Sequence, residues 1–172
     1  MGVSKRSYGD LLFDGEVKAV LQLVACPVLV IPAGWPGPEI GHVIFATDLA
    51  EADVRVIAEL VRLSARLKAR VSLSHVSRPV LIPDFAEELR TSSFTDRVMH
   101  LYPGIGCSNL RAANVMGALE QLSTEKHADL IELRYRKHPV WYRLFNENPL
   151  KEAMQHSQTP LLIFPENPGH HD

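Results

Sequence analysis

The sequence predicts an α/β fold in which a parallel β-sheet carries helices on both faces. Short, continuously apolar segments of strand length alternate with longer segments whose apolar residues recur at helical spacing. Continuously apolar strands are typical of parallel sheets, which are buried on both faces. A helix–strand pattern near the N-terminus also recurs near the C-terminus, which indicates an internal repeat. With 172 residues, the chain is long enough for one core or slightly more.

The repeated unit consists of a Leu-Phe pair, a helix and a strand between two prolines. The pairs are Leu12-Phe13 and Leu144-Phe145. The helical positions are Val17, Val20, Leu21 and Val24 in the first copy, and Leu150, Ala153, Met154 and Ser157 in the second. The strands are predicted as the apolar residues within Pro27–Pro32 and Pro160–Pro165, since proline interrupts a helix or a sheet ladder.

Between the two copies, strands and helices alternate as a parallel sheet requires. The first elements are a strand at His42–Thr47, a helix from Glu51 to about Lys68 and a strand at Arg70–Val76. The stretch that follows, to Leu101, contains a short helix whose exposed face holds Asp84, Glu87, Glu88 and Arg90. After it come a weaker strand near Gly104, a helix from about Asn114 to Lys126, and a strand at Ala128–Leu133.

The helix that begins at Glu51 has the pattern of a sheet-covering helix. Its apolar face is predicted to hold Val54, Ile57, Leu60, Val61 and Leu67, and its solvent face Asp53, Arg55, Glu59, Arg62 and Arg66. Asp48 and Glu51 have the spacing of a carboxylate capping box, so we expect them to cap the first turn.

Composition excludes several classes of protein. The formal net charge of -2 and the pI near 6.4 provide no global attraction to nucleic acid or to an anionic membrane. Two cysteines, Cys26 and Cys107, cannot form a disulfide framework and have no metal-ligand spacing. The apolar run Ala19–Trp35 is broken by prolines and a glycine and is too short for a membrane span. We therefore expect a cytoplasmic protein with no membrane partner.

Three segments carry a resemblance to a known family. The first, residues 42–76, begins His-Val-Ile-Phe-Ala-Thr-Asp-Leu-Ala-Glu and ends Leu73-Ser-His-Val76. Together with Ala128-Asp-Leu-Ile131 and Pro160-Leu-Leu-Ile-Phe-Pro165, it resembles the universal stress protein family over residues 42–165. The resemblance implies a Rossmann-like, five-stranded parallel sheet, dimerisation through the last strand, and a role in stress response. Some members of the family bind ATP and others do not.

The resemblance also implies a domain organisation. Residues 1–34 look like the phosphate loop, last helix and last strand of a second, incomplete universal stress domain, so the chain resembles a tandem pair. Residues 35–41 are expected to be a linker because of their prolines and glycines. Residues 42–167 are the complete domain, and residues 168–172 are a tail.

The apolar strand 28–31 needs a neighbour, because it cannot form a sheet alone. Since the family's dimers join through final strands, we expect it beside residues 161–164 of the same chain, as a pseudo-dimer, or against its own copy in a homo-oligomer. Its burial is worth several kcal/mol at about 25 cal/mol per Å². Deleting residues 1–34 is therefore expected to lower stability or to change the oligomeric state.

The phosphate-binding motif of the family departs from its pattern here. Members that bind ATP have Gly-x-x-Gly, nine residues, and Gly-Ser or Gly-Thr, so that backbone amides at a helix start face the phosphates. The matching residues are Arg134, Lys137, Glu147 and Asn148. Arg134 and Lys137 add bulk where phosphate would lie, and Glu147 adds a negative charge. Asn148 is followed by a proline, which removes an amide donor. We expect no ATP binding of the family's kind and no cofactor.

Other positions of the nucleotide site are partly retained. The N-terminal copy has Gly2 and Gly15 at the family spacing, with Lys5 and Glu16 at the other two positions. Asp48 matches the acidic residue that contacts nucleotide in binding members, and Thr47 precedes it. The alternative role of Asp48 is a helix cap.

The remaining candidates are weaker. The basic, aromatic loop from Arg134 to Arg143 is either a solvated loop or a site for anions, a partner or single-stranded nucleic acid. His75 is expected to be a hydrogen-bonded core histidine rather than a general base. His170, His171 and Asp172 are expected to be a frayed tail rather than a metal site. No catalytic constellation is recognised, and neither nucleic acid nor a metal is expected as a partner.

The sequence thus favours a non-enzymatic interaction or regulatory module of the universal stress type, with an unidentified protein partner. The alternative is a nucleotide-binding switch or a slow ATP hydrolase with a modified phosphate loop, in which Thr47, Asp48, Arg134, Lys137 and Asn148 form the site.

Overall fold

The structure is a computed structural model, and it describes residues 20–21, 23–32, 35–37, 39–79, 84–134 and 159–165. The candidates Gly2, Lys5, Gly15, Glu16, Lys137, Glu147 and Asn148 lie outside the described residues, as do the loop beyond Arg134, the second copy's helix, and the terminal histidines with Asp172. Of the first copy's helix, residues 20, 21 and 23 are described and helical, whereas Val24, which the pattern also predicts to be helical, lies outside the helix.

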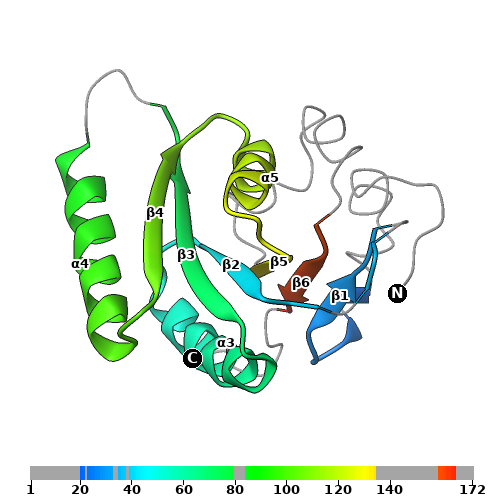
Figure 1. Ribbon diagram of the computed structural model, residues 1–172. Helices are drawn as coiled ribbons and strands as arrows, with labels where there is room; N and C mark the ends of the chain where they lie inside the picture. The colour runs from blue at the N-terminus through cyan, green and yellow to red at the C-terminus, as the bar shows by residue number, and fades with distance from the viewer. Residues whose placement is uncertain are drawn as a thin grey trace.

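Six strands form one sheet in the order β1-β6-β5-β2-β3-β4. The strands are β1 (Val28–Val30), β2 (His42–Thr47), β3 (Arg70–Ser77), β4 (Gly106–Arg111), β5 (Leu130–Arg134) and β6 (Leu161–Phe164). The five strands from β2 to β6 are parallel to their neighbours, and β1 pairs with β6 in the antiparallel direction. The predicted α/β class with a five-stranded parallel sheet is therefore confirmed (Figure 1).

The described helices cover both faces of the sheet (Figure 1). On one face, α3 (Glu51–Leu67) and α4 (Phe85–Leu101) pack Ile57, Leu60 and Val98 against Phe45 and other odd-numbered residues of β2. On the opposite face, α5 (Val115–Glu125) buries Met116, Leu119 and Leu122 against the even-numbered residues of β2 and against β5 and β6. This alternation follows from the period of two along each strand.

The N-terminal strand lies in the same sheet as the main domain. In the register of the two strands, Val28 pairs with Ile163 and Val30 with Leu161. Val30 is 1% exposed and belongs to the core cluster on the α5 side of the sheet. Within the single chain, β1 therefore lies beside β6. Dimerisation through the final strands stays a prediction.

Several element boundaries differ from expectation. The short helix predicted around Asp84–Arg90 is a helix of 17 residues, α4, which buries Thr91 and Thr95 along with Phe94 and Val98. Its polar buried residues conceal the helical period, since their hydroxyls bond to carbonyls of the preceding turn. The weak strand near Gly104 begins instead at Gly106.

Two expectations for α3 are wrong. Asp53, which the pattern predicts on the solvent face, is 2% exposed, whereas Leu67, predicted on the inner face, is 45% exposed. The capping box is absent, because the N-cap residue is Ala50, which makes no side-chain cap bond. Asp48 Oδ1 instead accepts a hydrogen bond from the Ala50 N–H at 3.2 Å, within the turn that leads into the helix.

The order of the strands determines where a site can form. The chain runs from central β2 outward through β3 to β4, then returns to β5 on the other side of β2 and continues to β6. The carboxyl ends of β2 and β5 thus flank a topological switch point, which is where doubly wound sheets bind ligands. In the described part of the chain, no helix is long and apolar enough to cross a membrane.

Candidate functional site at the carboxyl ends of β2 and β5

Three of the sequence candidates meet at the switch point. Thr47 ends β2, Asp48 follows it, and Arg134 ends the adjacent strand β5, where Ala46 is in register with Leu133. The side chains of Thr47 and Arg134 both project toward the side of the sheet that α3 covers. There both contact Asp53. The sequence therefore predicted which strand ends form the site.

A buried carboxylate that the sequence analysis misplaced forms the centre of this site. Oδ2 of Asp53 accepts a 2.7 Å hydrogen bond from the Thr47 hydroxyl and a 3.3 Å bond from the Asp48 N–H. Thr47 Oγ1 in turn accepts a 2.9 Å bond from the N–H of Leu49. The side chains of α3 and the turn after β2 thus hold each other in one arrangement.

The backbone of this turn has a conformation that most residues avoid. Leu49 has φ of 63°, in the left-handed region. The bonds from Leu49 N–H to Thr47 and from Ala50 N–H to Asp48 stabilise the turn on both sides. The resulting geometry points the start of α3, and with it Asp53, at the end of β5.

Arg134 is held by the same carboxylate. Its Nη1 lies 3.8 Å from Oδ1 of Asp53, and its side chain is 19% exposed. A guanidinium and a carboxylate that are both shielded from water attract each other more strongly than an exposed pair does. Nη1 makes no hydrogen bond, so the contact is an ion pair without a hydrogen-bonded fork.

His75 extends this network toward the outer strands. Its Nδ1 is 3.0 Å from the carbonyl oxygen of Thr47, and its Nε2 is 3.8 Å from Oε1 of Glu87 on α4. The side chain is 13% exposed, in keeping with the expected hydrogen-bonded core histidine. The imidazole therefore connects the turn after β2 with the first turns of α4.

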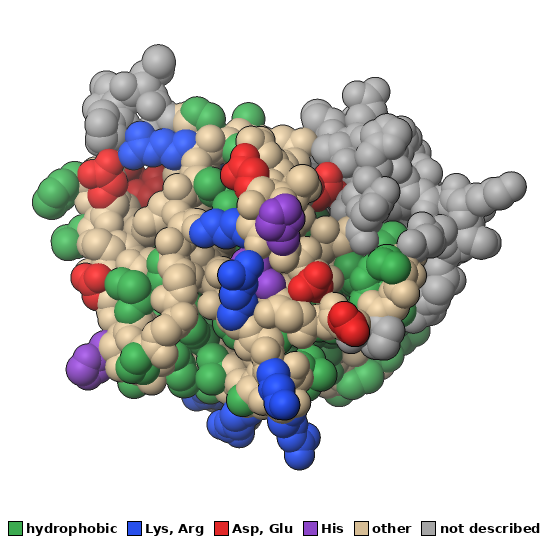
Figure 2. Space-filling view, in the orientation of Figure 1, with side chains coloured by type: hydrophobic (Ala, Val, Ile, Leu, Met, Phe, Trp, Pro, Cys, Tyr) green, Lys and Arg blue, Asp and Glu red, His purple; other side chains and the backbone are tan. Residues whose placement is uncertain are grey.

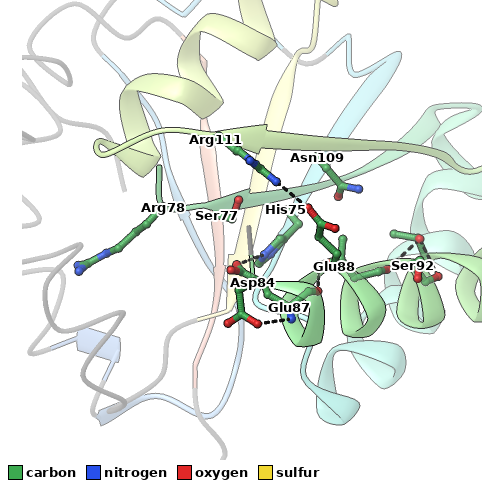
Figure 3. Close-up of a pocket in the computed structure, with 11 residues that line it drawn as sticks. His75, Ser77, Arg78, Asp84, Glu87, Glu88, Ser92, Asn109 and Arg111 are labelled. Carbon is green, nitrogen blue, oxygen red and sulfur yellow. Dashed lines mark hydrogen bonds and ion pairs between the residues drawn. The ribbon is translucent and has the colours of Figure 1, made fainter. Parts of the chain in front are cut away.

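An open pocket of about 280 Å³ lies beside His75, between the ends of β3 and β4 and the first half of α4. Figure 3 shows the N-cap residue Asp84, Glu87 from α4, and Asn109 and Arg111 from β4 around it. Two of its charged groups pair with each other, since Arg111 Nη2 is 3.0 Å from Glu88 Oε1. Asp84 instead caps α4, because its side chain accepts hydrogen bonds from the N–H groups of Ala86 and Glu87.

Glu132 is a second buried carboxyl group on the α3 side of β5. It is 0% exposed, and neither of its oxygens has a hydrogen-bond partner. Burial raises the pKa of this carboxyl to about 9, and the negative charge of Glu59 acts in the same direction. Glu132 is therefore protonated and neutral at pH 7. Within the described ranges, no group of three or more His, Cys, Asp or Glu side chains could hold a metal ion.

Sequence reasoning missed Asp53 and Glu132 for one reason. The period of a helix or strand separates its two faces, but it does not show that a carboxylate is buried. Carboxylates are mostly exposed in proteins, so the ordinary expectation for both residues is that they face solvent. The available signal for Asp53 was its position one turn after Thr47-Asp48, where the start of α3 must pass the ends of β2 and β5. No signal in the sequence distinguishes Glu132 from an exposed residue.

Solved structures of universal stress proteins share this fold. A universal stress protein from Archaeoglobus fulgidus DSM 4304 aligns with 99% of this chain and 61% of its own, with a TM-score of 0.65 and 17% identity. A universal stress protein solved in complex with cAMP aligns over 72% of this chain and 95% of its own, with a TM-score of 0.51 and 21% identity. Another from Archaeoglobus fulgidus covers 72% of this chain and 92% of its own, with a TM-score of 0.53 and 12% identity.

No protein-family model and no curated protein sequence matches the chain. The chain spans 61% of the length of the first Archaeoglobus protein. At identities of 12% to 21%, structural similarity establishes the fold. The strand order, the helices on both faces and these neighbours agree that the chain has the fold of the universal stress proteins.

Proposed function

We propose that this protein is a cytoplasmic stress-response protein of the universal stress type that acts as a non-enzymatic interaction or regulatory module. In this proposal it needs no cofactor and does not bind ATP as the family's binding members do. The observation that carries the proposal is the ion pair between Arg134 and Asp53 at the switch point.

The pair matters because of where Arg134 stands. By the resemblance, it matches the first glycine position of the family's phosphate motif, so in this proposal a side chain lies where a phosphate would approach the backbone. The carboxylate of Asp53 faces this position from a site that is 2% exposed, and it lies 3.8 Å from Arg134 Nη1. An incoming triphosphate would meet that charge, and it would have to separate Arg134 from its carboxylate before the guanidinium could serve it.

The partners in this proposal are an unidentified protein and a second copy of the chain, which would join through the final strands. The support is the placement of β1 beside β6, which makes the two strands neighbours in one sheet as the final strands of a family dimer would be. Nucleic acid is not proposed as a partner, since the formal net charge is -2.

The alternative proposal is a nucleotide-binding switch or a slow ATP hydrolase. One specific observation favours it: a structural neighbour was solved in complex with cAMP. In this chain Thr47 and Asp48 lie at the carboxyl end of β2, beside the switch point. Arg134 could pair with a phosphate if Asp53 released it. A monophosphate such as that of cAMP demands less space than the three phosphates of ATP, so the two ligands need separate tests.

Isothermal titration with ATP and Mg²⁺, and separately with cAMP, tests the proposal. We expect no heat of binding for either ligand up to about millimolar concentration. A dissociation constant in that range corresponds to a binding free energy of only about 4 kcal/mol. Micromolar affinity of the unaltered protein for either would overturn the proposal and favour the alternative.

A gain-of-function variant sharpens the test. Replacing Arg134, Lys137 and Glu147 with glycine and Asn148 with serine restores the family's motif. If those side chains are what exclude ATP, the variant should bind it more tightly than the parent protein. The control is Asp96→Asn, on the exposed side of α4, which should leave the titration unchanged.

A further inference from the structure

His42 and Ser72 lie in direct contact on the α5 side of the sheet, far along β2 and β3 from the switch point. Nε2 of His42 is 2.8 Å from Oγ of Ser72. Nδ1 of the same ring is 3.1 Å from the carbonyl oxygen of Lys126, the C-cap residue of α5. His42 is 3% exposed, so the protein holds both ring nitrogens in place.

These contacts define which nitrogen carries the proton in the neutral ring. A carbonyl oxygen only accepts hydrogen bonds, so Nδ1 is the protonated nitrogen and donates to Lys126. Nε2 then has a lone pair and accepts a hydrogen bond from the Ser72 hydroxyl. A hydroxyl that donates to an imidazole, which is itself oriented by a third group, is the arrangement of an activated nucleophile and its base.

The surroundings keep the imidazole neutral. Burial lowers the pKa of His42, and the positive charges of Arg70 and Lys126 act in the same direction, against the carbonyl of Lys126 and the carboxylate of Asp129. Oδ2 of Asp129 accepts the N–H groups of Gly41 and His42, both at 2.9 Å, and so fixes the backbone that carries the ring. The base is thus unprotonated and positioned at neutral pH.

Ser72 is half-buried and lies beside strand β4. Ser72 is in register with Gly106, which is exposed, and a Cβ at Gly106 would lie 3.8 Å from Ser72 Oγ. The glycine therefore leaves open the space next to the hydroxyl. Lys, Arg and His side chains gather near the centre of the face drawn in Figure 2. The positive charges of Arg70 and Lys126 act on the His42 ring.

We propose that Ser72 is a nucleophile that accepts an acyl group from a small activated ester with an anionic leaving group, with His42 as its general base. The product is the protein with an acyl group on Ser72, a covalent modification rather than a turnover. This inference is independent of the switch point, and it stands whether or not nucleotide binds there.

In the step, Ser72 Oγ forms a bond to the acyl carbon, and His42 Nε2 takes the hydroxyl proton. The bond between the acyl carbon and the leaving oxygen breaks, and the leaving group departs with the electron pair as an anion. The proton on Nε2 then passes to solvent. Arg70 and Lys126 provide positive charge around the pair, which suits an anionic leaving group.

The test uses p-nitrophenyl acetate with the full chain. Release of p-nitrophenolate should show one equivalent per protein, intact mass should increase by one acetyl group, and peptide mapping should locate that group on Ser72. Ser72→Ala should abolish the burst, and His42→Gln should slow it by about a hundredfold, the usual contribution of a general base.

Controls separate this role from a structural one. Ser77→Ala removes a serine of the same strand whose hydroxyl bonds to a carbonyl, and it should leave the burst unchanged. Ser72→Cys retains a nucleophile next to His42 and should be acetylated on sulfur, and Gly106→Val should slow acylation by covering the hydroxyl. Between about pH 5 and pH 8 the rate should rise to a plateau, with a midpoint below the ordinary value for histidine. Acetylation only on lysines, or an equal burst in Ser72→Ala, would overturn the proposal.

Discussion

The hydroxyl of Thr47 donates a 2.7 Å hydrogen bond to the carboxylate of Asp53, which joins the last residue of β2 to the first turn of α3. The same carboxylate is the partner of Arg134 at the end of β5. One buried acid therefore joins two strands and a helix at the place where a doubly wound sheet would otherwise receive a ligand. The polar groups of the switch point are engaged with each other.

Breaking this network should destabilise the fold. Asp53→Asn leaves the partly buried Arg134 without a counter-charge, and we expect the free energy of unfolding to fall by about 2 kcal/mol. Urea unfolding measures it, with the exposed Asp96→Asn as the matched control. A surface ion pair has a coupling energy of about 0.5 kcal/mol. A double-mutant cycle that combines Asp53→Asn with Arg134→Met should give a coupling energy well above that value. Additive effects of the two substitutions would contradict the pairing.

Glu132 should make stability depend on pH. Its pKa is raised to about 9 in the folded state from 4.5, so the folded protein retains a proton that the unfolded chain releases. Stability is therefore fully present below pH 4.5 and is lost as pH rises toward about 9, at about 1.4 kcal/mol per pH unit, or about 3 kcal/mol by pH 7.

Urea midpoints across this pH range test the effect of Glu132. Glu132→Gln is neutral at every pH and should remove this slope while leaving stability at low pH nearly unchanged. The exposed Glu39→Gln serves as control and should retain the slope. An identical pH dependence in the parent protein and Glu132→Gln would show that the carboxyl titrates normally.

The start of α3 offers a stabilising substitution. Ala50 is the N-cap residue, with extended φ and ψ of -82° and 148° and no side-chain cap bond. Ala50→Ser should supply a side-chain oxygen that accepts from the N–H groups at the start of α3 and raise stability by about 1 kcal/mol, seen as a higher melting temperature. Ala52→Ser, two residues inside the helix, cannot cap and should lower stability slightly. A reversed order of the two variants would contradict the assigned N-cap.

The N-terminal strand should contribute to the stability of the whole sheet. Val30 is 1% exposed, and Val30→Ala should lower the free energy of unfolding by about 2 kcal/mol. Leu23→Ala is the matched control, because Leu23 is 86% exposed and its truncation should have little effect. Removal of residues 1–34 should lower the melting temperature or change the mass of the assembly in solution. A deletion that changes neither would refute the contribution of this strand.

The sequence predicts the alternating elements well where their residues are apolar. β2 and α3 begin at the expected residues, and β3 and β6 are close to their expected ranges. The length of α4 was not predictable in the same way, since its inner face includes Thr91 and Thr95. Helical periodicity depends on apolar contrast, and threonine provides little of it.

The sites were predictable only where a family resemblance assigned positions. Thr47, Asp48 and Arg134 do come together, but their common partner Asp53 was assigned to solvent. The contact between His42 and Ser72 was not anticipated, because 30 residues separate them and the register of β2 against β3 is what places the two side chains together. Pairing of this kind follows from the fold and not from spacing along the chain.

The antiparallel ladder between β1 and β6 also has a consequence for assembly. Three residue pairs form this ladder, and a proline- and glycine-rich connection joins β1 to β2. The same three pairs would form if β1 came from a neighbouring copy of the chain. We therefore predict that at high concentration two chains exchange this strand reciprocally, so that each completes the other's sheet through the same residue pairs. Raising the protein concentration would then favour interlocked pairs, and dilution would return each strand to its own chain.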